Sequence, residues 1–154
     1  MCSSDLIVVD AAEWPGGTNS GNFDGILIDA PCTSTGTIRR HPDIGWLRQE
    51  ADIAPLVALQ QRLLQRAATL LRPGGTLVYC TCSLEPEEGE QAISAFLAAE
   101  PSMRRAPVEA GEVAGLAEIL TAEGDLRTLP SHLPRDEPRL SGLDGFYAAR
   151  LVKS

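Results

Sequence analysis

The stretch LLRPGGTLVYCTCSLEPEEGE, residues 70–90, decides the fold class of this 154-residue chain. Before it, apolar residues recur at helical spacing from about Arg48 to Leu71, and Pro73-Gly74-Gly75 predicts the end of that helix. Thr76 to Cys80 is a short apolar run typical of a buried strand, and an amphipathic helix is expected from Glu87 to Ala99. Helix, strand and helix in this order predict an α/β fold.

Further apolar runs on both sides of this stretch predict more strands. Leu6 to Val9 ends at Asp10, and Gly25 to Ile28 is closed by Asp29. Apolar strands alternating with helices predict a parallel sheet covered on both faces. Later strands are expected at Met103–Val108, Leu126–Leu129 and Phe146–Val152.

Strand ends are where this sequence carries its reactive groups. Ligands gather at the carboxyl ends of strands in open α/β sheets. Asp10, Asp29 and the segment Cys80–Ser83 all fall at such ends. A strand-end aspartate is also a common cap or turn residue, and a free cysteine is usually buried packing, so both structural interpretations stay open at this point.

The composition excludes several classes of protein. With 44% hydrophobic residues the chain can bury a core, and no apolar run approaches the roughly 20 residues that cross a bilayer. The first residues lack the basic and apolar regions of a signal peptide, which predicts a cytoplasmic protein with reduced thiols. The spacing of Cys80 and Cys82 is too tight for a zinc knuckle, and we expect no metal.

The net charge of −8 argues against binding of nucleic acid by charge alone. A local cluster of Arg39, Arg40 and Arg48 can bind phosphates, although arginines in such a cluster are often only solvent-exposed surface residues. RNA binding would therefore need basic surface outside these 154 residues.

Cys82 has the sequence context of a reactive thiol. It follows a predicted strand and precedes the helix expected near Glu87, whose positive end favours the thiolate form. A thiol redox role for Cys80 and Cys82 is disfavoured, because the pair lacks the CxxC spacing of such proteins.

Taken together, four segments resemble the Sun/RsmB family of RNA 5-methylcytosine methyltransferases, and the resemblance runs from about Ile7 to Leu151. It implies a class I methyltransferase fold with a Rossmann-like sheet, S-adenosylmethionine as cofactor and RNA as partner, with small-subunit ribosomal RNA as the substrate. The segments are DAPCTSTG (29–36), RRHPDIGWLR (39–48), the stretch 70–90 and GLDGFYAARL (142–151).

The resemblance also implies roles for single residues. Cys82 is the nucleophile that adds to carbon 6 of cytosine, and Cys32 assists release of the product. Asp10 matches the family position that contacts the adenine side of the cofactor. Asp29 matches the family position that lies beside both the cofactor and the target base. Pro31, Arg39 and Arg40 match the substrate-facing wall.

The assignment of the nucleophile has an alternative. DNA cytosine methyltransferases use the cysteine that follows proline, which is Cys32 here. We favour Cys82, because a protein that needs only Cys32 has no chemical reason to carry the second thiol. Other hypotheses are a class I methyltransferase acting on another substrate, with both cysteines structural, and an inactive remnant or RNA-associated scaffold.

Within the family pattern, residues 1–154 correspond to a partial catalytic domain that runs from the third strand to the last. The first two strands and their glycine-rich loop have no counterpart, so the missing N-terminal part of the same protein is an expected partner. In the strand order 3-2-1-4-5-7-6, their absence leaves the fourth strand with an unpaired apolar edge. We therefore expect this chain alone to bind the cofactor weakly and to be inactive.

Overall fold

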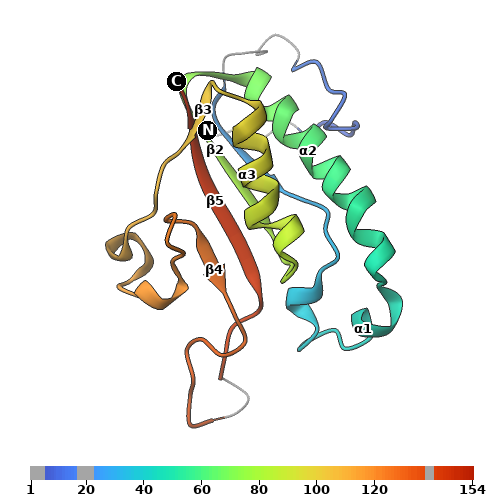
Figure 1. Cartoon of the computed structure of the whole chain (residues 1–154), viewed down its shortest axis with the longest axis vertical. Helices are drawn as coiled ribbons and strands as arrows, with labels where there is room; N and C mark the ends of the chain where they lie inside the picture. The colour runs from blue at the N-terminus through green and yellow to red at the C-terminus, as the bar shows by residue number, and fades with distance from the viewer. Residues whose placement is uncertain (1–5, 17–22, 138–140) are drawn as a thin grey trace.

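The computed structural model describes residues 6–16, 23–137 and 141–154. Figure 1 shows an α/β arrangement in which two long helices lie against a twisted sheet. Among the described residues, five short 3-10 turns connect the main elements, and the last two of them, Ala110–Val113 and Ala117–Ile119, lie between β3 and β4. The main elements are β1 (Phe23–Asp29), α1 (Ile44–Leu47), α2 (Ile53–Leu70), β2 (Leu71–Thr81), α3 (Glu90–Ala99), β3 (Met103–Arg105), β4 (Leu126–Thr128) and β5 (Phe146–Lys153).

The order of the strands is β1-β2-β5-β3, with β4 also pairing with β5. β1 and β2 are parallel, whereas β5 runs antiparallel to β2, β3 and β4. This order agrees with the 4-5-7-6 part of the strand order expected from the resemblance. The sheet is therefore mixed rather than wholly parallel as predicted, because the last strand, β5, enters it in the direction opposite to its neighbours.

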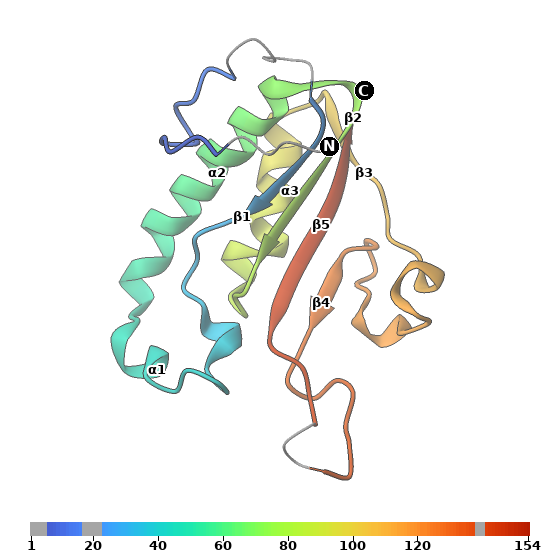
Figure 2. The same ribbon diagram turned by 180° about the vertical axis from the view of Figure 1, so that it is seen from behind.

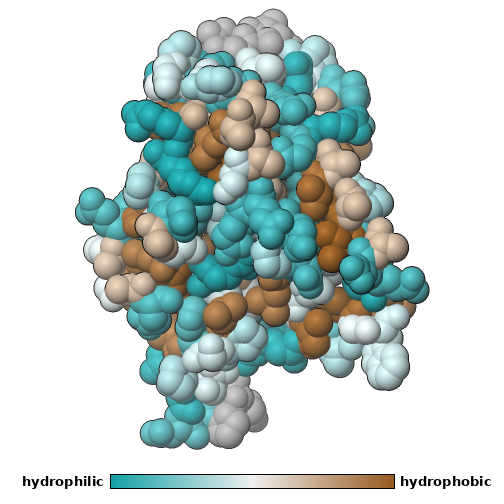
Figure 3. Space-filling view, viewed as in Figure 1, coloured by the Kyte–Doolittle hydropathy of each residue, from teal (hydrophilic) through white to brown (hydrophobic). Residues whose placement is uncertain are grey.

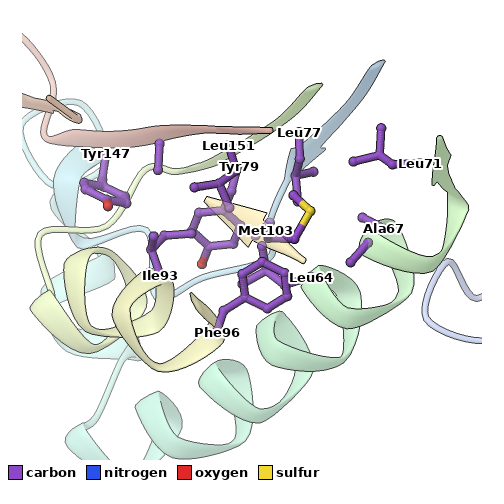
Figure 4. Close-up of a cluster of buried hydrophobic side chains, with 13 residues drawn as sticks. Leu64, Ala67, Leu71, Leu77, Tyr79, Ile93, Phe96, Met103, Tyr147 and Leu151 are labelled. Atoms are coloured by element: carbon purple, nitrogen blue, oxygen red, sulfur yellow. The ribbon is translucent and has the colours of Figure 1, made fainter. Parts of the chain in front are cut away.

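The hydrophobic core lies between the sheet and one layer of helices. Both α2 and α3 pack on the same face, as the opposite views of Figures 1 and 2 show. Figure 4 shows Leu64, Phe96 and Tyr79 meeting at the centre, and all three are fully buried. Burial of each such side chain contributes about 1.5–3 kcal/mol. The prediction of a sheet covered on both faces is wrong for the described residues, because the chain supplies long helices to one face only.

The predicted long helix is confirmed as α2, preceded by a 3-10 turn at Glu50–Asp52. It ends at Leu70 as expected, but Pro73-Gly74-Gly75 is not a separate loop. These residues bulge out of β2, so that Phe23 pairs with Leu71 and Gly25 already pairs with Thr76. Gly74 has a φ of +76°, a left-handed conformation that glycine adopts without steric cost.

The second predicted helix begins later than expected. Residues Pro86–Glu88 form a 3-10 turn, and α3 starts only at Glu90. Glu88 is fully buried in this turn, whereas Glu87 is exposed. The turn thus directs one acidic side chain of the PEEGE run into the protein.

The predicted strand at Leu6–Val9 is wrong, because this segment has no regular structure. A strand needs a hydrogen-bonded neighbour, and no described residue pairs with this run. Its side chains are accordingly solvated, with Leu6 92% and Val8 90% exposed. The strands predicted at Met103, Leu126 and Phe146 are confirmed, the first two in shorter form.

The outer edge of β1 has no partner strand among the described residues, as expected from the resemblance. Ile26 and Ile28 point toward the core, whereas Leu27 between them is 68% exposed on the uncovered face. On the helix-bearing side, Figure 3 shows a largely hydrophilic surface with separate apolar patches. No helix in the described part of the chain combines the length and the apolarity needed to cross a bilayer.

Candidate active site

Two thiols meet where β1 and β2 end. Because these strands are parallel neighbours, their carboxyl ends lie at the same edge of the sheet. Cys32 follows β1 by three residues, and Cys82 directly follows β2. Their Sγ atoms are 3.5 Å apart. The structure therefore brings together the two cysteines that the sequence singled out, although fifty residues separate them.

Backbone hydrogen bonds join three separate segments around these thiols. The Gly36 N–H donates to the Cys82 carbonyl at 3.0 Å, and the Gly145 N–H donates to the Gly36 carbonyl at 2.8 Å. A Cβ placed on Gly36 would lie 1.9 Å from the Gly145 carbonyl oxygen. Only glycine fits such a close approach of two backbones. The loop before β5 thus completes the wall of the site.

A buried carboxylate ties the two cysteine loops together beneath the thiols. Glu88 accepts hydrogen bonds from Thr33, which follows Cys32, and from Ser83, which follows Cys82. The sequence did not single out Glu88. It stands among four glutamates between positions 85 and 90, and no pattern marks the one that turns inward.

Burial is the main influence on two of the three described cysteines. It raises the pKa of the Cys32 thiol to about 11; a hydrogen bond at the Ser34 backbone opposes this, and Cys82 and Glu88 add to it. Burial and the neighbouring Asp29 carboxyl raise the pKa of Cys80 to about 11 as well. Both thiols are therefore neutral at physiological pH. Cys80 contacts the Ile28 carbonyl from its place inside the sheet, which agrees with a packing role.

Asp10, Asp29 and Pro31 line one open hollow beside the free edge of β1. Its volume is about 660 Å³, and most of its wall consists of apolar side chains from β1 and α2. Asp29 is exposed at the end of β1. Asp10 is also exposed and caps a turn by accepting the Ala12 N–H at 2.9 Å. An apolar wall with two carboxylates suits a nucleoside, whose base packs on apolar surface while its hydroxyl and amino groups donate to carboxylates.

The two arginines of the predicted substrate wall lie on the surface of the loop that follows Cys32. Arg39 donates to the Ser141 carbonyl at 2.7 Å, and Arg40 forms an ion pair with Asp144 at 2.5 Å. The hydrogen bond to Asp144 raises the pKa of Arg40. Both side chains therefore brace the loop before β5 in this structure. In the described ranges, no three His, Cys, Asp or Glu side chains gather as a metal site requires.

Comparisons with known proteins find relatives that match nearly the whole chain. A profile of the family described as 16S rRNA methyltransferase RsmB/F matches residues 2–152. The chain is 47% identical over 142 residues to the ribosomal RNA small subunit methyltransferase B of Erwinia tasmaniensis. This match covers 92% of the chain and 28% of the relative, so the chain spans less than a third of that protein.

Two solved structures show the same fold. NSun6 from Pyrococcus horikoshii, solved with SFG, matches with a TM-score of 0.70 and 26% identity over 97% of this chain and 34% of its own. A methyltransferase homologue from Pyrococcus horikoshii matches with a TM-score of 0.56 and 33% identity, over 86% of this chain and 39% of its own. The α/β fold of class I methyltransferases is thereby confirmed.

Proposed function

Because the chain belongs to the 16S rRNA methyltransferase RsmB/F family, we propose that it carries both reacting thiols of an S-adenosylmethionine-dependent RNA cytosine-5 methyltransferase. The observation that carries this proposal is the 3.5 Å separation of the Cys32 and Cys82 sulfur atoms at adjacent strand ends. The chain spans 28% of the Erwinia tasmaniensis relative, so we propose the reaction for a protein that also has the remaining parts of such relatives.

The chemistry explains why a thiol is needed. Carbon 5 of cytosine is a poor nucleophile. When a thiolate adds to carbon 6, carbon 5 becomes electron-rich and can attack a methyl group. We assign this addition to Cys82. Carbon 5 then takes the methyl group, its proton leaves to a base, and the bond between carbon 6 and Cys82 breaks to restore the ring. Covalent catalysis thus divides one difficult step into easier ones.

Cys32 fits the second role in this reaction, which is release of the methylated product. Its raised pKa keeps it neutral at physiological pH, so it does not compete as a nucleophile. It lies close enough to Cys82 to act on the same adduct. We therefore assign release of the product to Cys32, by exchange of protons with the adduct as its ring is restored.

S-adenosylmethionine would supply an electrophilic methyl group on its sulfonium. We place its nucleoside part in the hollow beside β1, where Asp10 and Asp29 offer carboxylate acceptors among apolar side chains. Asp29 and Pro31 lie between this hollow and Cys32, which suits contact with the target base. NSun6 was solved with SFG, an analogue of S-adenosylmethionine, which supports this choice of cofactor.

The name of one relative supports the choice of substrate. The Erwinia tasmaniensis protein is a small-subunit ribosomal RNA methyltransferase. We propose the same RNA here, in the cytoplasm, with the cytosine unstacked so that its ring reaches the thiols. Arg39 and Arg40 then contact the RNA backbone next to the target, after exchange of their present carbonyl and carboxylate partners.

Trapping on RNA that contains 5-fluorocytosine tests this proposal. Fluorine cannot leave carbon 5 as the proton does, so the adduct with the protein persists. We would graft this chain in place of the matching segment of the Erwinia tasmaniensis relative and follow the adduct by denaturing electrophoresis. Cys82→Ala is expected to abolish the adduct, whereas Cys32→Ala should still form it.

The same experiment separates the competing hypotheses. An adduct that survives Cys82→Ala and disappears with Cys32→Ala would reverse the assignment of the nucleophile. Methyl transfer to RNA that is insensitive to both substitutions would mean that the cysteines are structural. Cys80→Ala is the matched control, because Cys80 is also buried at this end of β2 and is expected to leave adduct formation intact.

A further inference from the structure

Glu88 is a charged side chain with no exposed surface. A buried carboxylate is costly unless hydrogen bonds replace the lost water. Here the Thr33 N–H lies 3.1 Å from both carboxylate oxygens, the Thr33 hydroxyl donates at 2.5 Å and the Ser83 hydroxyl at 2.6 Å. Gln60 adds an N–H at 3.0 Å. Every partner donates, and the two carboxylate oxygens accept all of these hydrogen bonds.

The positions of these donors in the chain are informative. Thr33 is the residue after Cys32, and Ser83 is the residue after Cys82. Their hydroxyls are also 3.1 Å from each other. One carboxylate therefore binds both loops at the residue next to each thiol. The loops also meet directly farther along, where the Gly36 N–H donates to the Cys82 carbonyl and the Leu84 N–H donates to the Thr35 hydroxyl, both at 3.0 Å.

Glu88 is itself held in place from two sides. The Tyr79 hydroxyl donates to the Glu88 carbonyl at 2.8 Å. Gln60 reaches from α2 and donates also to the Pro31 carbonyl at 2.9 Å, which fixes the orientation of its amide. The carboxylate is thus a rigid point to which the loops attach, rather than a mobile side chain that follows them.

We propose that Glu88 is a positioning residue that holds the Cys32 and Cys82 thiols at reacting distance. This inference rests on the proposed function, since it concerns the two thiols of that reaction. Glu88 does not touch the thiols. It acts through Thr33 and Ser83, and misplacing a reacting group by about 1 Å can slow a reaction on the order of a hundredfold.

Thiol oxidation in this chain tests the proposal without RNA or cofactor. Diamide takes two electrons and two protons from the thiols of Cys32 and Cys82, and a disulfide bond forms between their sulfur atoms. The rate of this step depends on how closely the thiols are held. Mass spectrometry of the linked peptides distinguishes this disulfide from one that involves Cys80.

Two substitutions of Glu88 by side chains of similar size distinguish the effect of its hydrogen bonds from the effect of its volume. Glu88→Met fills the volume without a strong acceptor, whereas Glu88→Gln keeps one carbonyl oxygen. We expect disulfide formation to slow at least tenfold in Glu88→Met and to recover in part in Glu88→Gln. The exposed neighbour provides the control, and Glu87→Gln should react at the unaltered rate. Equal rates in the Met and Gln variants would overturn the proposal.

If Glu88→Met does not unfold cooperatively in urea, Ser83→Ala carries the test, because it removes a single hydroxyl from the network. It should slow disulfide formation several-fold, and an unchanged rate would overturn the proposal. In the grafted protein, Glu88→Gln should lower kcat for adduct formation and leave KM for RNA unchanged. Absence of an adduct in the unaltered graft would contradict the proposed function, whereas the disulfide rates would still decide the role of Glu88.

Discussion

Gly36 shows how far the geometry of the site depends on a single residue. A methyl group there would overlap the Gly145 carbonyl, which lies 1.9 Å from an ideal Cβ. Because the Gly36 backbone is hydrogen-bonded to both Cys82 and Gly145, it cannot move away freely. We expect Gly36→Ala to lower the free energy of unfolding by about 3 kcal/mol, as overpacking of this kind does.

Urea unfolding measures this loss. The matched control is Gly45→Ala, because nothing lies within 4 Å of a Cβ at Gly45. That substitution should change the free energy of unfolding by less than about 0.5 kcal/mol. A similar loss for both glycines would contradict the crowding seen at Gly36.

The raised pKa of Cys32 makes a second prediction at the residue scale. Only the thiolate reacts with iodoacetamide, and a pKa near 11 leaves little thiolate at pH 8. Folded Cys32 should therefore react roughly a hundredfold more slowly at pH 8 than the same residue in urea. The rate should rise as the pH increases toward 11. Fast reaction of Cys32 in the folded chain at pH 8 would contradict its burial.

At the residue scale, the sequence analysis singled out the two thiols but not Glu88, which binds the residue after each of them. The positions of Cys32 and Cys82 after two apolar strands predicted that they lie at one edge of the sheet, whereas their pairing in one site was implied only by the resemblance. Glu88 was not predictable, because its burial depends on the 3-10 turn at Pro86–Glu88 and on donors from two distant positions, Thr33 and Gln60. Arg39 and Arg40 were expected to face RNA, but a local pattern cannot reveal their partners a hundred residues away.

At the scale of elements, the strands illustrate what an apolar run can and cannot predict. β1 and β2 were predictable because their runs are bounded by turn residues and pair with each other. The run at Leu6–Val9 has the same composition but no described partner, and it is exposed. Side-chain pattern indicates that a segment can form a strand, whereas the backbone needs a neighbour to do so.

The unpaired edge of β1 makes a prediction about association. An exposed apolar edge strand is a template for pairing with another chain, and charge on such an edge opposes it. Leu27→Lys should therefore reduce self-association of the chain, measured by sedimentation, while its stability is preserved because Leu27 is 68% exposed. Thr69→Lys, at an exposed position of α2, is the control and should not change association. Equal association of the Leu27→Lys and unaltered chains would mean that the β1 edge plays no part.

At the scale of the whole molecule, the hollow beside β1 has apolar walls from one strand and one helix and opens to solvent. An open site with few fixed polar groups binds a charged nucleoside weakly. Calorimetric titration of this chain with S-adenosylmethionine should therefore show no micromolar binding. The grafted protein, which restores the remaining parts of the relative, should bind. Micromolar affinity of the isolated chain would contradict this prediction.

The hydrogen bonds that link Gly145, Gly36 and Cys82 also bear on the order in which the protein matures. Residue 145 is synthesised after both thiols, 63 positions beyond Cys82. The wall around them closes only when β5 inserts between β2 and β3. A nascent polypeptide therefore remains without the finished wall around its two thiols until β5 has been synthesised.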